Sequence, residues 1–268
     1  MSAARSSRAR LVGVIHLPPL PGSPRSKLDV AEIVRGAAAD ARALADAGFD
    51  VAMIENFGDT PFFGGPVPRI TVASMTACAV AARAAAPSIA LGVNVLRNDA
   101  DAALAIARVT GASCIRVNVH TGARVTDQGL VQGDAAATLR ARRDLGAEQV
   151  AIWADVDVKH SAPLAARPVG DEAQDLVHRG MAEVVLVTGA GTGRAADTSK
   201  LRAVREALPN TPVLVASGAT IESLPELASL SDGVIVGSAL RDGGIAGGPI
   251  DRARAVSFAL AFRRAFGA

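Results

Sequence analysis

The chain contains few aromatic residues and little cysteine. Its 268 residues include no tyrosine, one tryptophan and seven phenylalanines, and its formal net charge is only +2. Nucleic-acid-binding proteins use aromatic faces for base stacking and a strongly basic surface for phosphates, so we expect no nucleic-acid partner. Cys78 and Cys114 are the only cysteines, and their spacing argues against a disulfide framework or a cysteine-rich zinc site. Free thiols suit a reducing compartment, and we expect a cytoplasmic protein.

Long hydrophobic runs are also missing. No stretch approaches the roughly twenty apolar residues of a transmembrane helix, so no transmembrane segment is expected. The apolar stretch from Leu11 to Ile15 is too short for the core of a signal peptide. We expect residues 1–10, which are rich in Ser and Arg, to form a flexible tail. Residues 11–268 should form one domain, because half of the chain is apolar and no Pro/Gly/Ser-rich linker divides it.

Short Val/Ile/Leu-rich segments alternate with longer Ala/Arg/Leu segments of helical period. This alternation is typical of βαβ units around a parallel sheet. Eight segments of each kind predict an α/β fold, a single closed (β/α)8 TIM barrel, with an open doubly wound sheet as the alternative. The expected strands are Leu11–Leu17, Asp50–Glu55, Ile89–Val95, Cys114–His120, Val150–Lys159, Glu183–Thr188, Pro212–Ala216 and Gly233–Val236. The helices should begin near Asp29, Arg69, Asp99, Gly129, Asp171, Thr198, Glu222 and Asp251.

Glycine and serine follow the last two expected strands, as Ser217-Gly218 and Gly237-Ser238. Glycine lets the backbone approach an anion, serine offers a hydroxyl, and the next helix supplies free N–H groups. The loops after the last two strands of a TIM barrel frequently hold a phosphate. We therefore predict a phosphate site; the alternative is two core strands followed by ordinary glycine turns.

A glycine-rich segment follows the sixth expected strand. We expect Gly189, Thr192 and Gly193 to form a backbone nest for an anionic group, with Thr188 against the substrate. The segment does not match the G-x-G-x-x-G dinucleotide fingerprint. Neither a nicotinamide nor a flavin cofactor is therefore expected.

Polar and apolar side chains alternate in the middle strands. Successive side chains of a barrel strand face the outer helices and the interior in turn, so the apolar sets should face the helices. Unpaired buried charges cost several kcal/mol each, which favours a functional cluster. The alternative is a self-satisfied ion-pair network that only closes the top of the core. The residues predicted to point inward are Arg116, Asn118, His120, Asp155, Asp157 and Lys159, joined by Glu55 and Asn94.

These residue types suggest roles. Lys159 beside Asp157 could act as a general acid or base, or as an amine nucleophile. Asp155 and Glu55 are the further catalytic candidates. Alternatively, Asp155 and Asp157 with Glu55 or a histidine could hold Mg²⁺, although carboxylates two apart on one strand converge less cleanly than ligands on separate strands. Substrate binding is assigned to Asn94, Arg116, Asn118 and His16, of which His16 is equally compatible with a hydrogen-bonded rim residue. Phe57, Phe62 and Phe63 lie in one loop and suggest a lid, a partner patch or a buried hinge.

Several segments together carry a family resemblance. They are Gly13–Pro24, Glu55–Asp59, Asn94–Asn98, Arg116–His120, Thr126–Gly129, Ala154–His160, and Thr188-Gly189 with Thr192-Gly193. In this order and spacing they resemble the BtpA family, named for a photosystem I biogenesis protein, over nearly the whole chain. The resemblance implies a (β/α)8 barrel close to the ribulose-phosphate-binding group. It transfers no catalytic roles, and because relatives occur in organisms without photosynthesis it implies an older enzymatic activity.

We therefore expect an enzyme of lyase or isomerase type that acts on a phosphorylated sugar or nucleotide-like small molecule at the C-terminal mouth of the barrel. The alternative is a non-catalytic assembly factor for a membrane protein complex, working through surface loops such as residues 57–66. The sequence leaves the metal requirement open, and a homo-oligomer is compatible with it.

Overall fold

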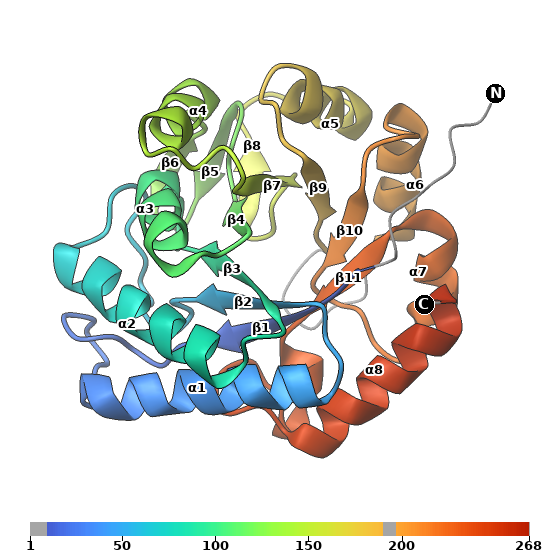
Figure 1. Cartoon of the computed structure of the whole chain (residues 1–268). Coiled ribbons are helices and arrows are strands. Elements are labelled where there is room, and N and C mark those ends of the chain that lie inside the picture. The colour runs from blue at the N-terminus through green and yellow to red at the C-terminus, as the bar shows by residue number, and fades with distance from the viewer. Residues whose placement is uncertain (1–9, 190–196, 268) are drawn as a thin grey trace.

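The computed structural model describes residues 10–189 and 197–267. Eight parallel strands close into a barrel in the order β1-β11-β10-β9-β7-β4-β3-β2, and helices surround the ring (Figure 1). The predicted (β/α)8 barrel is confirmed. The barrel strands are β1 (Arg10–His16), β2 (Val51–Glu55), β3 (Ala90–Asn94), β4 (Cys114–Val117), β7 (Ala151–Val156), β9 (Val184–Val187), β10 (Val213–Ala216) and β11 (Gly233–Val236). The helices are α1 (Val30–Asp46), α2 (Arg69–Ala85), α3 (Ala100–Thr110), α4 (Ala135–Asp144), α5 (Val169–His178), α6 (Thr198–Ala207), α7 (Leu224–Leu230) and α8 (Arg252–Phe266), with short 3₁₀ turns η1 (Ser238–Leu240) and η2 (Asp242–Gly244).

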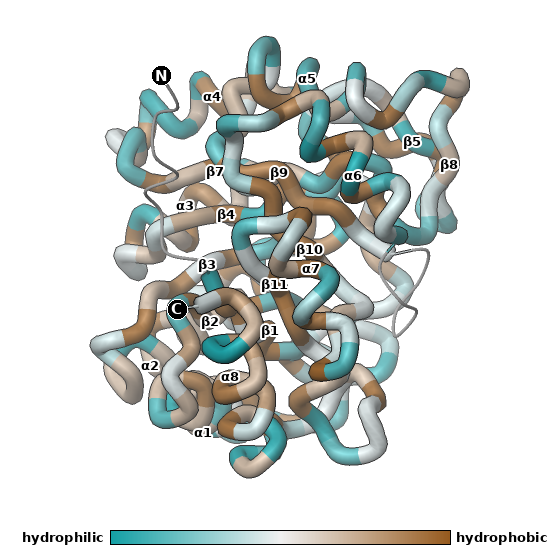
Figure 2. Tube along the Cα trace, turned by 90° about the vertical axis from the view of Figure 1, so that its right-hand side faces the viewer, coloured by the Kyte–Doolittle hydropathy of each residue, from teal (hydrophilic) through white to brown (hydrophobic). Residues whose placement is uncertain are grey.

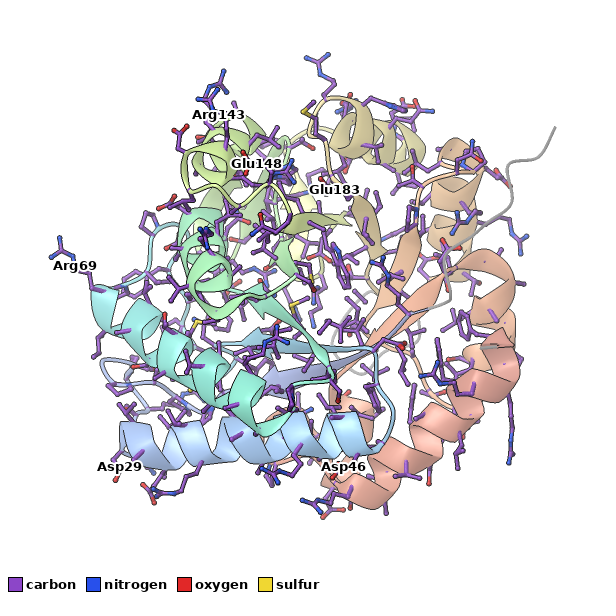
Figure 3. The ribbon with its side chains drawn as sticks, in the orientation of Figure 1. Asp29, Asp46, Arg69, Arg143, Glu148 and Glu183 are labelled. Carbon is purple, nitrogen blue, oxygen red and sulfur yellow. The ribbon has the colours of Figure 1, made fainter. Side chains whose placement is uncertain are left out.

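Helix α1 shows how the sequence sets these elements. Asp29 is the N-cap: its carboxylate accepts from the Glu32 backbone N–H at 2.7 Å, and the Glu32 carboxylate accepts from the Asp29 N–H at 3.2 Å. This capping box satisfies two N-terminal donors that no helical turn can reach. Asp29 and Asp46 lie at the two ends of the helix (Figure 3). The buried residues Ile33, Ala37, Ala41 and Leu44 follow the helical period and face the strands.

Several predicted boundaries differ from those of the structure. The helix expected near Gly129 begins only at Ala135, because a small antiparallel sheet precedes it. Its strands are β5 (Ala123–Thr126), β6 (Gly129–Gln132) and β8 (Ser161–Pro163), in the order β6-β5-β8. Gly129 has a φ of +90°, a left-handed conformation that glycine adopts freely and that lets the chain turn tightly between β5 and β6. In addition, Arg10, expected in the tail, is the first residue of β1.

The barrel interior consists of an apolar layer beneath a polar one. Since side chains two apart on a strand share a face, on four of the strands an inward apolar residue has a polar residue one pleat above it. The pairs are Val14 and His16 on β1, Met53 and Glu55 on β2, Cys114 and Arg116 on β4, and Trp153 and Asp155 on β7. Hydrophobic residues follow the strands in Figure 2, with hydrophilic ones concentrated in the outer turns. The apolar layer closes the N-terminal part of the barrel, so the inward-facing polar side chains are confined to the C-terminal mouth.

A larger apolar core fills the space between the strands and the helices. Helix α8 contributes the buried rings of Phe258 and Phe262, which are 2% and 0% exposed. Among the described residues, no helix combines the length and the apolar character that crossing a membrane requires.

Replacing Phe258 by alanine should lower the free energy of unfolding by about 3–5 kcal/mol, because it leaves a cavity between α8 and the barrel. Leu260 lies on the same helix but is 55% exposed, so Leu260→Ala should change stability by less than about 0.5 kcal/mol. Urea unfolding followed by circular dichroism compares the two. Equal losses would contradict this packing of α8.

Candidate functional site

Four polar side chains from four neighbouring strands meet at the C-terminal end of the barrel interior. Asn94 donates from Nδ2 to Oε2 of Glu55 at 2.7 Å. Arg116 donates from Nε and Nη2 to the two carboxylate oxygens of Asp155, each at 3.0 Å, and its Nη1 lies 4.0 Å from Oε2 of Glu55. The four are at most 7% exposed. As the alternation predicts, they point inward and form one connected network.

Asn118 extends this network past the end of β4. Its Nδ2 donates to Asp155, which therefore has both oxygens engaged. The Oδ1 atoms of Asn94 and Asn118 are buried and accept no hydrogen bond from a described residue. A buried polar atom without a partner is costly, so these two oxygens are suited to accept hydrogen bonds from a bound molecule.

His120 does not join the site. The fourth strand ends at Val117 rather than at residue 120, and the His120 ring turns away so that Nε2 lies 2.8 Å from the carbonyl oxygen of Gly180. Burial lowers the pKa of His120. A neutral imidazole with Nε2 protonated can donate to this carbonyl, so the residue acts as a packing element.

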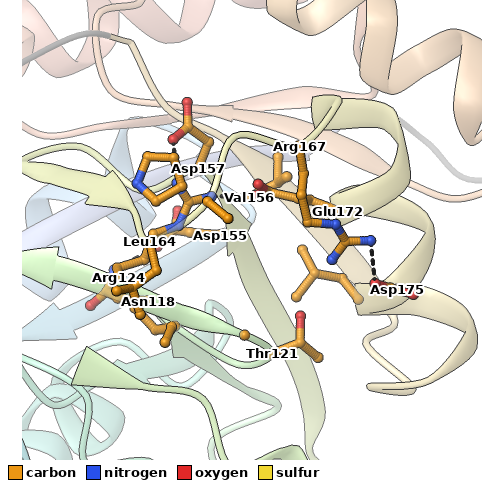
Figure 4. Close-up of a pocket in the computed structure, with 16 residues that line it drawn as sticks. Asn118, Thr121, Arg124, Asp155, Val156, Asp157, Leu164, Arg167, Glu172 and Asp175 are labelled. Atoms are coloured by element: carbon orange, nitrogen blue, oxygen red, sulfur yellow. Dashed lines mark hydrogen bonds and ion pairs between the residues drawn. The ribbon is translucent and has the colours of Figure 1, made fainter. Parts of the chain in front are cut away.

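Asp157 also departs from the prediction. Strand β7 ends at Val156, and Asp157 adopts a left-handed φ of +48°, which breaks the period of two. Its carboxylate pairs with Arg124 at 2.7 Å and with Lys200. Figure 4 shows Asp157 and Arg124 in a neighbouring pocket, which shares Asn118 and Asp155 with the polar network and also includes Glu172 and the ion pair of Arg167 with Asp175. The expected juxtaposition of Asp157 and Lys159 at the barrel mouth is therefore wrong.

Lys159 lies at the mouth, where it lines two cavities together with Glu55, Arg116 and Phe57. Burial lowers the pKa of the Lys159 ammonium; Arg116 lowers it further, whereas Glu55 and then Asp155 oppose the shift. The Lys159 backbone N–H donates to Oγ1 of Thr188 at 3.2 Å. A lysine with a lowered pKa is a candidate proton carrier.

Thr188 was expected to touch substrate, but its hydroxyl is already engaged. It accepts from the Lys159 backbone and donates to the carbonyl oxygen of Asp157 at 3.3 Å, and the residue is 0% exposed. Its role is to hold the turn that carries Lys159. Gly189 follows it as a buried residue, whereas Thr192 and Gly193 lie outside the described residues.

The residues predicted to bind phosphate share a cavity with the polar network. Ser217, Gly218, Gly237 and Ser238 line it with His16, Glu55, Arg116 and Lys159. Ser217 and Gly218 have φ values of +95° and +82°, so the chain turns sharply after β10. The backbone N–H groups of Gly218 and Ala219 donate to no described residue. The lining of the cavity therefore combines the hydroxyl-bearing Ser217 and Ser238 with the basic Arg116 and Lys159.

His16 lies in this cavity wall. Its Nδ1 accepts from the Gly247 backbone N–H at 3.2 Å, and its ring stacks on Phe57 with 4.2 Å between centroids. Burial lowers the pKa of His16 well below 6.5, with further lowering by Arg241, Lys159 and Arg116. The neutral ring accepts at Nδ1, so Nε2 carries the proton and can donate.

Sequence reasoning missed Arg97. This residue is 6% exposed and lines a cavity of about 400 Å³ with Phe57, Phe62, Asn118 and Lys159. Its Nη2 donates to the carbonyl oxygen of Lys159 at 2.7 Å. Alternation could not find Arg97 because β3 ends at Asn94; the one signal was its place in the segment Asn94–Asn98.

The loop after β2 contributes to the walls of the site. Phe57 and Phe62 line the cavity, while Phe63 is 57% exposed. Asn56 ties this loop to the loop after β3, donating to the Leu96 carbonyl oxygen at 3.3 Å and accepting from the Leu96 N–H at 2.7 Å. Two of the three loop phenylalanines are thus part of the site.

The carboxylates of the network are engaged by Arg116, Asn94 and Asn118, as described above. Across residues 10–189 and 197–267, no group of three or more His, Cys, Asp or Glu side chains is arranged to hold a metal ion.

Comparison with known proteins identifies the family. The model of the BtpA family matches residues 7–264. The chain belongs to the BtpA family. An uncharacterized protein of Thermococcus kodakarensis is 44% identical over 237 residues, covering 88% of each chain. The photosystem I biogenesis protein BtpA of Synechocystis is 40% identical over 250 residues, covering 92% of this chain and 86% of that one.

Solved structures share the fold of this BtpA-family protein at low sequence identity. KGPDC of Streptococcus mutans has a TM-score of 0.60 at 13% identity, covering 97% of this chain and all (100%) of that one. The phosphoribosyl anthranilate isomerase of Thermus thermophilus has a TM-score of 0.56 at 14% identity, covering 95% and 98%. Orotidine 5′-monophosphate decarboxylase of Methanocaldococcus jannaschii has a TM-score of 0.53 at 12% identity, covering 95% and 99%.

The lowered pKa of His16 makes stability depend on pH. In the unfolded chain the imidazole binds a proton near pH 6.5, whereas in the folded protein it does so only at lower pH. Below about pH 6.5 the unfolded state therefore binds more protons than the folded state. The free energy of unfolding should fall as the pH drops below this value, by up to about 1.4 kcal/mol per pH unit for one proton. The pKa of His120 is also lowered, so this residue contributes to the fall in the free energy of unfolding with the same sign.

Urea unfolding between pH 7.5 and 5 measures this slope, and His16→Asn should reduce it by up to one proton's share. A slope that is unchanged in the variant would show that His16 titrates alike in the folded and unfolded chains.

Proposed function

We propose that this BtpA-family protein is an enzyme of lyase or isomerase type that acts on a phosphorylated sugar or nucleotide-like small molecule at the mouth of the barrel. One observation carries the proposal: the pairs Ser217-Gly218 and Gly237-Ser238 line the same cavity as Lys159 and Glu55. If these two serine–glycine pairs hold the phosphate of a substrate, the rest of the substrate would lie next to Lys159 and Glu55.

The phosphate end combines three kinds of donor. The hydroxyls of Ser217 and Ser238 and the backbone amides of Gly218 and Ala219 supply hydrogen bonds, and Nε2 of His16 supplies one more. Arg116 and Lys159 line the same cavity and add positive charge. Neutral donors and a nearby cation together suit a dianion, since charge-assisted hydrogen bonds are stronger than neutral ones.

Proton transfer is assigned to Lys159 and Glu55. The lowered pKa of Lys159 raises the fraction of neutral amine available to accept a proton near neutral pH, and Glu55 faces the same cavity. Such a pair can move a proton between neighbouring carbons of a carbonyl substrate or assist cleavage of a carbon–carbon bond. Asp155, predicted as catalytic, is instead proposed to fix the Arg116 guanidinium, and Asn94 and Asn118 to orient the substrate through their buried Oδ1 atoms.

The names of two fold neighbours support this substrate class. One is an isomerase named for a phosphoribosyl compound and the other a decarboxylase named for a 5′-monophosphate. At 14% and 12% identity they share the fold alone, so no residue role is transferred from them.

The assembly-factor alternative takes its support from the name of the Synechocystis relative and from the exposed ring of Phe63. It predicts a stable protein partner that is lost on Phe63→Ser and kept on Lys159→Met. We favour the enzyme because Phe57 and Phe62 of the same loop line the cavity.

Gly237 offers a test of the phosphate end. A Cβ at this position would lie 2.8 Å from Cε1 and 3.0 Å from Nε2 of His16, so Gly237→Ala must displace the imidazole. We expect the variant to bind sorbitol 6-phosphate at least tenfold more weakly, measured by isothermal titration calorimetry. Gly36→Ala is the matched control, since a Cβ there meets nothing within 4 Å; equal affinities in all three proteins would reject the site.

Lys159→Met should abolish turnover of a substrate identified by screening phosphosugars and nucleotides with and without Mg²⁺. The side chains have similar length, so the melting temperature should change little while kcat falls by at least 10²-fold, as expected when a general acid or base is lost. Wild-type kcat in the variant would remove Lys159 from the mechanism.

A further inference from the structure

Two cavities lie at the barrel mouth: the one that holds the proposed phosphate end and a second one. They share Glu55, Phe57, Arg116 and Lys159 in their walls, so we treat them as two lobes of one site. We call the second cavity the distal lobe; it has a volume of about 400 Å³, and Arg97, Asp127 and Phe62 are among its further lining residues. A substrate anchored by its phosphate would reach this lobe with its opposite end.

Arg97 is a buried cation with spare donors in the distal lobe. Its side chain is held by one described hydrogen bond, from Nη2 to the carbonyl oxygen of Lys159 at 2.7 Å. Nε is buried and donates to no described residue, and no described carboxylate lies within ion-pair distance of the guanidinium. Burying a guanidinium without a carboxylate partner is energetically costly, and binding an anion would remove this cost.

Arg124 in the neighbouring pocket shows the contrast. It is as buried as Arg97, at 7% exposure, but pairs with both Asp157 and Glu172 (Figure 4). Arg124 therefore has two carboxylate partners among the described residues. Arg97 differs in facing a cavity instead.

The charge around the distal lobe selects the anion. Three basic side chains (Arg97, Arg116 and Lys159) and two acidic ones (Glu55 and Asp127) line the cavity, leaving one net positive charge. A carboxylate carries one negative charge, and its two oxygens match the planar donor fork of arginine. A second phosphate would carry up to two negative charges into a region that already holds two carboxylates.

We propose that the distal lobe binds a carboxylate through Arg97, so that the substrate is a phosphorylated acid with its phosphate and carboxylate at opposite ends. This inference rests on the proposed phosphate site and adds the chemical class of the substrate. Arg97 is then the residue that sets specificity for the acid over the corresponding alcohol.

A matched pair of probes tests it. 6-Phosphogluconate and sorbitol 6-phosphate differ at one end only, a carboxylate against a hydroxymethyl group. By calorimetry, the acid should bind wild-type protein at least tenfold more tightly. In Arg97→Met this ratio should fall to about one while sorbitol 6-phosphate binds as before. Arg124→Met, which removes a buried arginine from the neighbouring pocket, should keep the wild-type ratio, and melting temperatures check that each variant is folded.

Each result decides one proposal or both. A ratio near one in wild-type protein, or a ratio that survives Arg97→Met, overturns the carboxylate lobe and leaves the phosphate site standing. Binding of gluconate that depends on Arg97, without binding of either phosphorylated probe, keeps the carboxylate lobe and overturns the phosphate site. Binding of none of the three overturns both. If Arg97→Met does not fold, Arg97→Lys replaces it, and the ratio should then fall at least threefold because the donor fork is lost.

Discussion

The buried ion pair of Arg116 with Asp155 is the interaction on which the site depends. Two parallel hydrogen bonds of 3.0 Å join the pair in a barrel interior that apolar side chains fill from below. Neither charge would be tolerated there alone. Because Arg116 also approaches Glu55, and Glu55 accepts from Asn94, one guanidinium allows two carboxylates to lie at the barrel mouth.

The proposed phosphate end depends on a different buried arginine. Arg241 is 1% exposed and donates to the carbonyl oxygens of Val14, Gly237 and Gly248. It therefore ties β1, the end of β11 and the following loop together behind the cavity. The charge of Arg241 also helps to lower the pKa of His16. Arg241 therefore favours the neutral imidazole, which stacks on Phe57 and can donate from Nε2.

The sequence predicts this architecture where periodicity governs it and fails where the backbone leaves regular structure. Period-two alternation correctly orients Glu55, Asn94, Arg116 and Asp155, because each lies within a strand. It fails at Asp157, where a positive φ ends the pleat. Arg97 and Arg241 were not predicted because they follow strand ends, where the direction of a side chain is set by loop contacts such as the bond from the Arg97 N–H to the Phe63 carbonyl oxygen.

The hierarchy of charges at the mouth explains which group can move a proton. Asp155 has both oxygens bound by Arg116 and Asn118, so its side chain is held in one position. Glu55 accepts one close hydrogen bond, from Asn94, and lies farther from Arg116. Glu55 also opposes the lowering of the Lys159 pKa more than Asp155 does. Arg116 thus disfavours the charge of the Lys159 ammonium, whereas the carboxylate of Glu55 favours it. A change in the charge of a bound substrate would shift this balance, which is the condition for a lysine to release and regain a proton within one catalytic cycle.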